Sequence, residues 1–483
     1  MGEEDKLHQC KTHVDSLLSL KGSEGLRETS YPSRSLSFLR RLKEPSPEEN
    51  TPLQAKVKLQ IIVSGAGLGG LATAIALRRR GHHVTVFERA PELGEVGAGI
   101  QVPPNSSRLL LKWGLEPYLQ GKALEPKEIR IRRWQDGSII GLTKLVPDFQ
   151  ENFGAPYYVV HRANLQLGMY KLALDLGVEV KVNSGVKEYD ETGPRVTLED
   201  GTVANADLVV AADGLKSEAR RVVLQGVDQP PQKAGFAAYR AMVDAEQMRG
   251  DPDTSWLLDS PGQNLWLGHG RHAMTYAVAG GKSFNMVLSH PEHSDPSTWK
   301  QETAVEDMKK QFEGWDPCLT KVINMIQTTL KWPLLSGKPL KRWLSSSGKL
   351  VILGDAAHPM VPYMSEGAAM AVEDGAALAE VLSLVESKSQ VHDALKVFQN
   401  VRLIRTGQMQ EASLVNGKLW HFPDGPEQRA RDAAMRAEVE GKVVIESANQ
   451  WSDPMTQQWA YGYDAEEVIA TAWKESCRLR AQL

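Results

Sequence analysis

The stretch that decides the fold runs from Leu59 to Glu88 and reads LQIIVSGAGLGGLATAIALRRRGHHVTVFE. Its first residues, Leu59–Ser64, are rich in β-branched side chains, which is typical of a buried strand. Apolar residues at helical spacing follow, and Gly81 ends that helix before a second apolar run, His83–Glu88. A strand, a glycine turn, a helix and a strand within about 30 residues indicate a parallel βαβ unit.

The turn of this unit has the spacing G-x-G-x-x-G. Gly65 allows the tight turn, Gly67 lets the backbone approach a pyrophosphate, and Gly70 allows close packing of helix on strand. The pyrophosphate would lie on unpaired N–H groups at the positive end of the helix dipole. Glu88 follows about 20 residues later, where an acidic side chain can bind the ribose hydroxyls. This context predicts a bound dinucleotide; the alternative is a βαβ unit that binds nothing.

Length and composition exclude several classes of protein. The 483 residues predict two to four domains at about 100–200 residues each. Lys and Arg total 56 against 60 Asp and Glu, and the net charge of −4 does not favour nucleic acid as a partner. No run approaches the ~20 apolar residues of a membrane helix. The start, MGEEDK, lacks both a secretory signal and a myristoylation pattern, so we expect a cytoplasmic protein without a membrane anchor.

The cysteines restrict the redox chemistry that is available. Cys10, Cys318 and Cys477 lie far apart, without a C-x-x-C motif or a His-Cys cluster. A disulfide framework, a metal site and a dithiol centre are therefore not expected. If the chain is a redox enzyme, its electrons must therefore pass through a bound organic cofactor.

Two further glycine and acid motifs lie downstream. Ala211–Ser217 reads AADGLKS after a predicted strand, and Leu353–Met360 reads LGDAAHPM after another. With the glycine turn, these motifs resemble the single-component (group A) FAD-dependent aromatic hydroxylases of the salicylate-hydroxylase type, over about residues 59–405. The resemblance is also carried by Glu88-Arg89, Gly97–Ile100, Asn105, His161-Arg162, Pro362 and Glu366–Ala371.

The resemblance implies a fold and a reaction. The fold is α/β: a Rossmann-like FAD-binding domain with a β-rich substrate domain, as in para-hydroxybenzoate hydroxylase, and a helical C-terminal region. In the reaction, NAD(P)H reduces FAD, dioxygen gives a flavin C4a-hydroperoxide, and its distal oxygen passes to an aromatic acid or phenol. The cofactor-binding residues that it implies are Gly65, Gly67, Gly70, Glu88, Arg89, Gly99, Arg162, Asp213, Gly214, Asp355, Gly367, Ala368 and Ala369.

Three residues are expected to serve the substrate. The resemblance places Pro362 beside the flavin ring, and Tyr239 with Arg240 lies on a predicted strand of the substrate domain. An arginine can bind a carboxylate or phenolate through two parallel hydrogen bonds. The alternative for Arg240 is an ion pair with a structural acid.

Two departures from the family pattern concern the site. Glu366 stands where the family usually has glutamine, and a carboxylate beside an anionic reduced flavin is unfavourable unless it points away or is protonated. The basic residue that often precedes a Gly-Gly pair is missing before Gly280. The family's substrate is therefore not transferred to this chain.

Histidine and tryptophan residues give weaker signals. His269 and His272 are candidates for a general base, with surface positions as the alternative, whereas His161 and His358 are interpreted as structural. Five tryptophans could line a planar pocket but fit a core equally well: Trp256, Trp266, Trp299, Trp315 and Trp332.

Hydrophobic patterning elsewhere predicts helices over 164–176, 303–312 and 367–385, and strands over 178–182, 195–199, 203–211 and 349–353. We predict a disordered extension over 1–56, FAD-binding segments over 57–232 and 333–390, a substrate domain over 233–332, and a helical region over 391–483. A monomer or homodimer is expected.

Two other functions stay open. The same flavin chemistry could epoxidise or dearomatise an isoprenoid, indole or polyketide secondary metabolite, for which an apolar pocket without an anion-binding group would be the sign. A flavin-binding sensor or scaffold without turnover is the alternative from another class.

Overall fold

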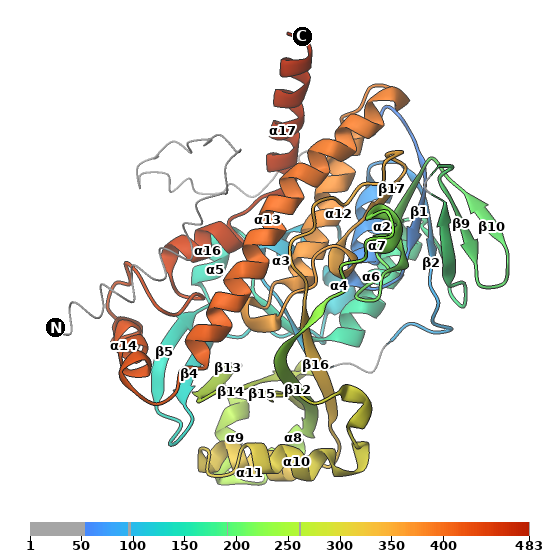
Figure 1. Cartoon of the computed structure of the whole chain (residues 1–483). Coiled ribbons are helices and arrows are strands. Elements are labelled where there is room, and N and C mark those ends of the chain that lie inside the picture. Colours follow the sequence, from blue (N-terminus) through green and yellow to red (C-terminus); the bar gives the residue numbers. More distant parts are fainter. Residues whose placement is uncertain (1–53, 95–97, 191, 260–261, 483) are drawn as a thin grey trace.

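The computed structural model describes residues 54–94, 98–190, 192–259 and 262–482. Nearly all of the predicted extension, and Gly97 of the GAGI motif, lie outside the described residues. Figure 1 shows a parallel sheet wrapped by helices, a second sheet below it, and a long C-terminal helix across both. The predicted α/β class, with a Rossmann-like unit and a second sheet, is confirmed.

The parallel sheet has five strands in the order β17-β11-β1-β2-β7. All four neighbouring pairs are parallel, and the central strands are buried because helices cover both faces. The bounds are β1 Gln60–Ser64, β2 His83–Phe87, β7 Glu179–Lys181, β11 Leu208–Ala211 and β17 Leu350–Ile352.

The helix after the glycine turn, α2 (Leu68–Arg79), packs closely on α12 (Gly367–Ser383). A Cβ added at Gly375 of α12 would lie 2.9 Å from the backbone nitrogen of Thr73 in α2, so only glycine allows this approach. The contact brings the N-terminal end of α12 beside the turn. Other helices around the sheet are α3 Pro104–Lys112, α4 Glu116–Leu119, α5 Asp148–Phe153, α6 Arg162–Asp175 and α7 Glu218–Val223.

The second sheet has seven strands in the order β16-β12-β15-β14-β13-β4-β5, and only β13 and β4 pair in parallel. β4 and β5 precede the predicted substrate domain in sequence, so this sheet is built from two separate stretches of chain. Its strands are β4 Glu128–Arg133, β5 Ile139–Lys144, β12 Gln232–Asp244, β13 Gln263–Gly268, β14 Arg271–Val278, β15 Ser283–Pro291 and β16 Leu330–Ser336. Helices of the same region are α8 Ala245–Arg249, α9 Pro252–Asp259, α10 Ala304–Gln311 and α11 Pro317–Met325.

The predicted strand over 203–211 is two strands. The first, β10 (Val203–Asn205), pairs with β9 (Arg195–Leu198) in an antiparallel sheet that β8 (Val186–Asp190) completes. The second is β11, and between them the Asp207 carboxylate accepts a hydrogen bond from the backbone nitrogen of Gln60. β3 (Gly99–Val102) and β6 (Tyr158–His161) form a separate antiparallel pair.

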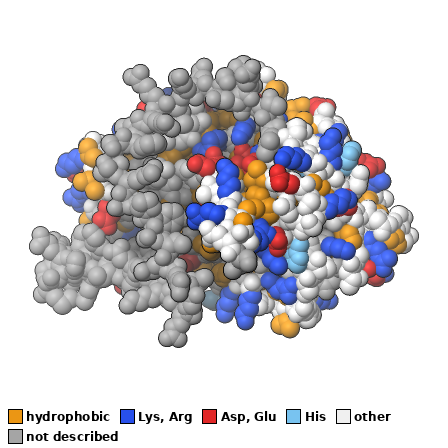
Figure 2. Space-filling model, turned by 90° about the horizontal axis from the view of Figure 1, so that it is seen from above, with side chains coloured by type: hydrophobic (Ala, Val, Ile, Leu, Met, Phe, Trp, Pro, Cys, Tyr) orange, Lys and Arg blue, Asp and Glu red, His pale blue; other side chains and the backbone are white. Residues whose placement is uncertain are grey.

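Helices make up most of the C-terminal region, and the longest of them, α13, crosses the molecule (Figure 1). On the face in Figure 2, basic and acidic side chains are interspersed over the surface that is not grey. In the described ranges no helix combines the length and apolar character that a membrane span requires. The bounds are α13 Val391–Trp420, α14 Pro426–Ala434, α15 Arg436–Val439, α16 Pro454–Tyr461 and α17 Ala465–Arg480, with short 3-10 turns η1 Ala279–Gly281, η2 Pro296–Thr298, η3 Gln301–Thr303, η4 Gly354–Ala356, η5 Pro362–Met364 and η6 Lys388–Gln390.

Candidate functional site

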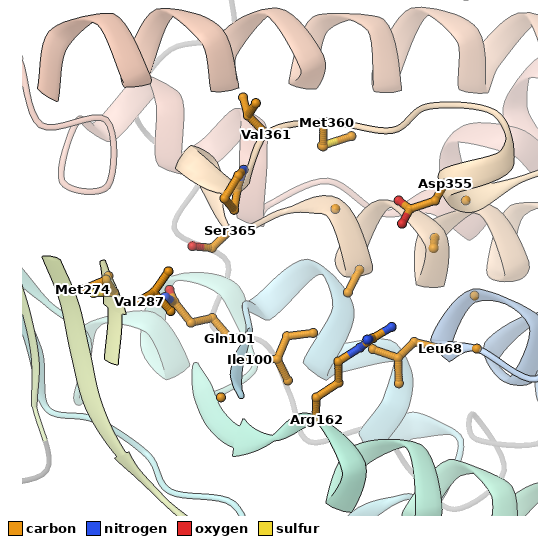
Figure 3. Close-up of a pocket in the computed structure, with 18 of the residues that line it drawn as sticks. Leu68, Ile100, Gln101, Arg162, Met274, Val287, Asp355, Met360, Val361 and Ser365 are labelled. Carbon is orange, nitrogen blue, oxygen red and sulfur yellow. The ribbon is translucent and has the colours of Figure 1, made fainter. Parts of the chain in front are cut away.

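A cavity of about 420 Å³ lies between the glycine turn, the N-terminal end of α12 and one face of the seven-stranded sheet. Figure 3 shows Leu68 and Asp355 at one end of it and Met274 and Val287 at the other, with Gln101 between them. One end therefore lies beside α2 and η4, at the edge of the parallel sheet, and the other lies on β14 and β15 of the seven-stranded sheet. We call them the glycine end and the Arg240 end.

The glycine turn has the geometry that its motif predicts. Gly65 has φ +99°, and a Cβ there would lie 2.5 Å from the carbonyl oxygen of Ala212. A Cβ at Gly70 would lie 1.9 Å from the carbonyl oxygen of Gly65. A Cβ at Gly67 would meet nothing within 4 Å, and Gly67 lines the cavity. The fold therefore requires glycine at 65 and 70, whereas Gly67 leaves open space for a ligand.

Glu88 and Arg89 lie beside this turn but do not line the cavity. The Glu88 carboxylate accepts hydrogen bonds from the backbone nitrogens of Ala66 at 2.6 Å and Ala90 at 2.8 Å. Since a carboxylate offers about four lone-pair positions, it can also accept from ribose hydroxyls. Arg89 is exposed and forms an ion pair with Glu199 at 2.8 Å.

The chain crosses the cavity floor at β3 and the start of α6. Gly99 and Arg162 both line the cavity. The backbone nitrogen of Gly99 donates to Asn285 Oδ1 at 2.7 Å, and a Cβ at Gly99 would lie 2.4 Å from the Tyr276 ring. Glycine therefore allows β3 to lie against the second sheet, and the Arg162 side chain lies along the floor (Figure 3).

The two downstream acid motifs have different surroundings. Asp213 Oδ2 accepts from the Tyr189 hydroxyl at 3.0 Å and from the backbone nitrogen of Ala219 at 3.2 Å, so Asp213 braces the start of α7. Its neighbour Gly214 lines the cavity. Asp355 is exposed and lines the cavity itself.

The N-terminal end of α12 presents unpaired backbone groups. Its first backbone hydrogen bond runs from the nitrogen of Met370 to the carbonyl oxygen of Glu366 at 2.8 Å. No helical carbonyl accepts from Gly367, Ala368 or Ala369, which form the first turn. Gly367 and Ala368 line the cavity, so an electron-rich group there would lie at the positive end of the helix dipole.

Buried charged side chains join α12 to its neighbours. His358 Nε2 lies 2.6 Å from Asp374 Oδ2, and Arg402 Nε donates to Asp374 Oδ1 at 2.7 Å. Burial raises the pKa of Asp374, but His358 and Arg402 outweigh burial and the pKa ends below its usual value. His358 is thus a structural partner of α12, as its motif predicted.

Arg240 lines the other end of the cavity. The structure shows no ion pair between Arg240 and any carboxylate in the part of the chain that it describes. Burial and the nearby Arg162 lower the pKa of Arg240, whereas Tyr276 raises it. Pro362 of η5 lines the cavity close to Ser365 and Gly367. This end therefore offers a partly buried cation to an anionic ligand.

His272 and Tyr276, from β14, also line this end. His272 Nδ1 lies 2.9 Å from Nε2 of His421, and burial, with a smaller effect of His421, lowers the pKa of His272 well below its usual value. Burial raises the pKa of Tyr276. Both rings are therefore neutral near pH 7. His269 is exposed and does not line the cavity.

Tyr239 does not lie with Arg240. Successive side chains of β12 point to opposite faces of the sheet. Tyr239 is 1% exposed, stacks on His290 with a centroid distance of 4.9 Å, and belongs to the apolar core under α8–α11. Its predicted contact with substrate therefore has no support in the geometry.

The aromatic walls of the Arg240 end come from the C-terminal region. Trp420 ends α13 and Trp451 precedes α16, and their ring centroids are 5.2 Å apart. Neither was singled out from the sequence, although the aromatic run Trp420–Phe422 was a visible signal. None of the five tryptophans considered from the sequence lines the cavity. Other unpredicted lining residues are Gln101, Met274, Val287, Met360 and Val361.

The residues present fit FAD. The glycine turn, the open space at Gly67 and the free N–H groups of α12 all border one cavity, which continues to Arg240. A dinucleotide with a ring system needs such a continuous site, with a pyrophosphate cradle and a polar contact for the ring.

Sequence and fold similarity to known proteins also indicates an FAD-binding chain. Residues 58–413 match a family model described as an FAD binding domain. The FAD-dependent monooxygenase OpS4 of Beauveria bassiana is 37% identical over 86% of this chain and 97% of its own length. A 3-amino-4-hydroxybenzoate 2-monooxygenase of Streptomyces cremeus is 36% identical over 84% of this chain and 96% of its own. The structure of CtdE in complex with FAD and a substrate has a TM-score of 0.72, at 25% identity, over 88% of this chain and all of that one.

Proposed function

Because the chain belongs to this family of FAD-binding, hydroxylating monooxygenases, we propose that it uses NAD(P)H and dioxygen to hydroxylate an aromatic acid or phenol. FAD is its cofactor. When bound, FAD supplies the redox and oxygen chemistry, including the oxygen-transfer route expected from the sequence. NAD(P)H as reductant and a cytoplasmic location are parts of the proposal.

The observation that carries the proposal is Arg240. A guanidinium in a cavity without an ion-paired carboxylate is costly, and an anionic ligand compensates that cost. Its planar donors match a carboxylate or phenolate. Trp420, Trp451 and Met274 give the same space apolar walls that suit an aromatic ring. Arg240 thus orients the substrate while these walls exclude water.

The glycine end would hold the cofactor. Gly65, Gly67 and Gly70 form the pyrophosphate cradle, and Glu88 binds the ribose of the adenosine half. Gly99 and Arg162 would lie beside the cofactor, and Gly214 and Asp355 would border it. The N–H groups of Gly367, Ala368 and Ala369 would stabilise the electron-rich edge of the flavin, with Pro362 between the cofactor and substrate. Asp213 and Arg89 act indirectly, through the start of α7 and the rim of the turn.

His272 is the cavity residue best suited to take a proton from a phenol. It is neutral, so its ring nitrogen can accept a proton, but burial and His421 lower its pKa and make it a weak base. Tyr276 is neutral too, and because burial raises its pKa it keeps its own proton and is not a base.

A second candidate function is epoxidation or dearomatisation of an isoprenoid, indole or polyketide. The observation in its favour is the apolar lining from Met274, Val287, Met360, Trp420 and Trp451. Arg240 opposes it, because a neutral substrate leaves the cation without a partner.

Binding of a matched pair of ligands tests the proposal. A hydroxybenzoate and its methyl ester would be titrated into the flavin-loaded protein, with the flavin absorption spectrum as the readout. We expect the acid to bind at least tenfold more tightly than the ester. Equal affinities, or tighter binding of the ester, would favour the second candidate function.

A further inference from the structure

The buried acid Glu366 lies directly beside the cavity. Glu366 precedes α12, between the cavity-lining residues Ser365 and Gly367, but its own side chain does not line the cavity. Ser365 has φ +61°, a left-handed conformation directly before Glu366. The Glu366 side chain enters the protein interior, where the residue is only 1% exposed.

Glu366 has few hydrogen bonds for a buried acid. Its Oε2 accepts one bond, from Asn105 Nδ2 at 2.9 Å. Its Oε1 is fully buried, and among the residues that the structure describes neither this atom nor Asn105 Oδ1 has a hydrogen-bond partner. The pair thus holds two buried acceptors without a donor, and a proton on the carboxyl group supplies one.

Glu373, two turns along the same helix, shows what an ionised acid requires here. It is fully buried, and it accepts from Arg402 Nη1 at 2.7 Å and Arg405 Nη2 at 2.9 Å, as well as from Asn105 at 2.8 Å. Burial raises the pKa of Glu373, but the two arginines outweigh burial and lower it overall. Within the described ranges, no arginine donates a hydrogen bond to Glu366.

The groups that face Glu366 do not compensate a charge on it. Asn105 of α3 donates one bond, and Arg405 of α13 is committed to Glu373. Glu373 of α12 is itself negative, and Tyr157 and the α16 residue Tyr461 are buried phenols. Burial raises the pKa of Glu366 to about 8, with Glu373 adding to the rise and Asn105 and Arg405 opposing it.

We propose that Glu366 is held as a neutral carboxylic acid and acts as a positioning residue, whose proton keeps the start of α12 free of negative charge so that the helix can hold the electron-rich edge of reduced FAD. The inference rests on the proposed place of FAD at α12. Loss of the proton would put a negative charge one residue from Gly367, where it would repel an electron-rich flavin edge and compete with it for the positive end of the helix dipole. Reduction of FAD above the pKa of Glu366 would therefore be accompanied by uptake of one further proton by this residue.

The test is the midpoint potential of bound FAD as a function of pH, without substrate. Three proteins would be compared: the wild type, Glu366→Gln, and the control Glu380→Gln. Glu380 is a buried acid of the same helix whose pKa is also raised by burial, but it lies about 20 Å along the axis from Glu366. The glutamine at 366 keeps the bond from Asn105 and cannot ionise.

We expect all three proteins to behave alike below pH about 8. Above it, the ratio of reduced to oxidised FAD at a fixed potential should fall up to tenfold more per pH unit in the wild type and in Glu380→Gln than in Glu366→Gln. The carbonyl stretch of a protonated carboxyl group, seen by infrared spectroscopy at neutral pH, should disappear in Glu366→Gln only.

Two results would overturn the inference. Equal pH slopes in the wild type and Glu366→Gln would show that no proton of Glu366 is linked to the flavin. Absence of the protonated carboxyl band from the wild type would show that Glu366 is ionised. A protein that binds no flavin would instead contradict the proposed function, and this inference with it.

Discussion

The two ends of the cavity are built in opposite ways. The glycine turn, which gives the glycine end its name, comes from one continuous stretch, in which β1, the turn and α2 follow each other along the chain. The Arg240 end is assembled from β12, β14, β15, η5 and the region around Trp420 and Trp451. A contiguous motif tolerates little change because backbone fits against backbone. A wall of side chains from distant segments can change its ligand without changing the fold.

The largest effect is expected at Gly70. In Gly70→Ala the added Cβ would lie 1.9 Å from the carbonyl oxygen of Gly65, so the turn must open. We expect a loss of at least about 3 kcal/mol of stability and no retained FAD. Urea unfolding and the flavin content of the purified protein measure both.

Gly67→Ala is the matched variant. A Cβ there meets no protein atom within 4 Å, so the fold should keep its stability while FAD binding weakens. Loss of stability in Gly67→Ala equal to that in Gly70→Ala would contradict the division between packing and cofactor space.

Glu366, where the two ends meet, gives the next effect. A buried acid whose pKa rises from 4.5 to about 8 on folding destabilises the protein increasingly as the pH rises from 4.5 to 8. Glu366→Gln removes this pH-dependent destabilisation, because glutamine cannot ionise. We therefore expect the variant to gain stability over the wild type with increasing pH, by about 4 kcal/mol at pH 8, and nothing below pH 4.5.

Urea unfolding of both proteins at several pH values measures the difference. A stability difference that does not change with pH would show that Glu366 is ionised in the folded protein.

Arg240→Met should affect only the Arg240 end of the cavity. Loss of a charge-assisted contact should weaken binding of an aromatic acid by about 2 kcal/mol, or about 30-fold in Kd. Binding of the methyl ester and the content of FAD should stay unchanged. Titrations followed by flavin absorbance measure these affinities, and an equal loss for acid and ester would mean that Arg240 acts through packing.

The smallest effect is expected at the neighbouring residue. Tyr239→Phe changes a side chain on the other face of β12, so substrate affinity should change by less than about twofold. The same titration decides this, and a tenfold loss would restore the substrate role predicted from the sequence.

Local patterns explain how much the sequence could predict. The βαβ unit, the α/β class and the family resemblance are confirmed, because the glycine turn and its strands are adjacent in the chain. Strand alternation predicts that either Tyr239 or Arg240 faces the cavity, but not which one, since the register of β12 depends on β15 and β16. Trp420 and Trp451 reach the cavity through packing of α13, which no local pattern records. The roles of the cofactor-binding residues stay predictions.

The most direct test of the account follows oxidation of NADH and NADPH in air by the flavin-loaded protein. Hydroxybenzoates, indoles and larger phenols would be added in turn, and peroxide would be quantified. The account predicts that an aromatic acid or phenol accelerates oxidation while peroxide stays low, because oxygen passes to the ligand. Acceleration by indoles alone, or a rate that no ligand changes, would contradict it.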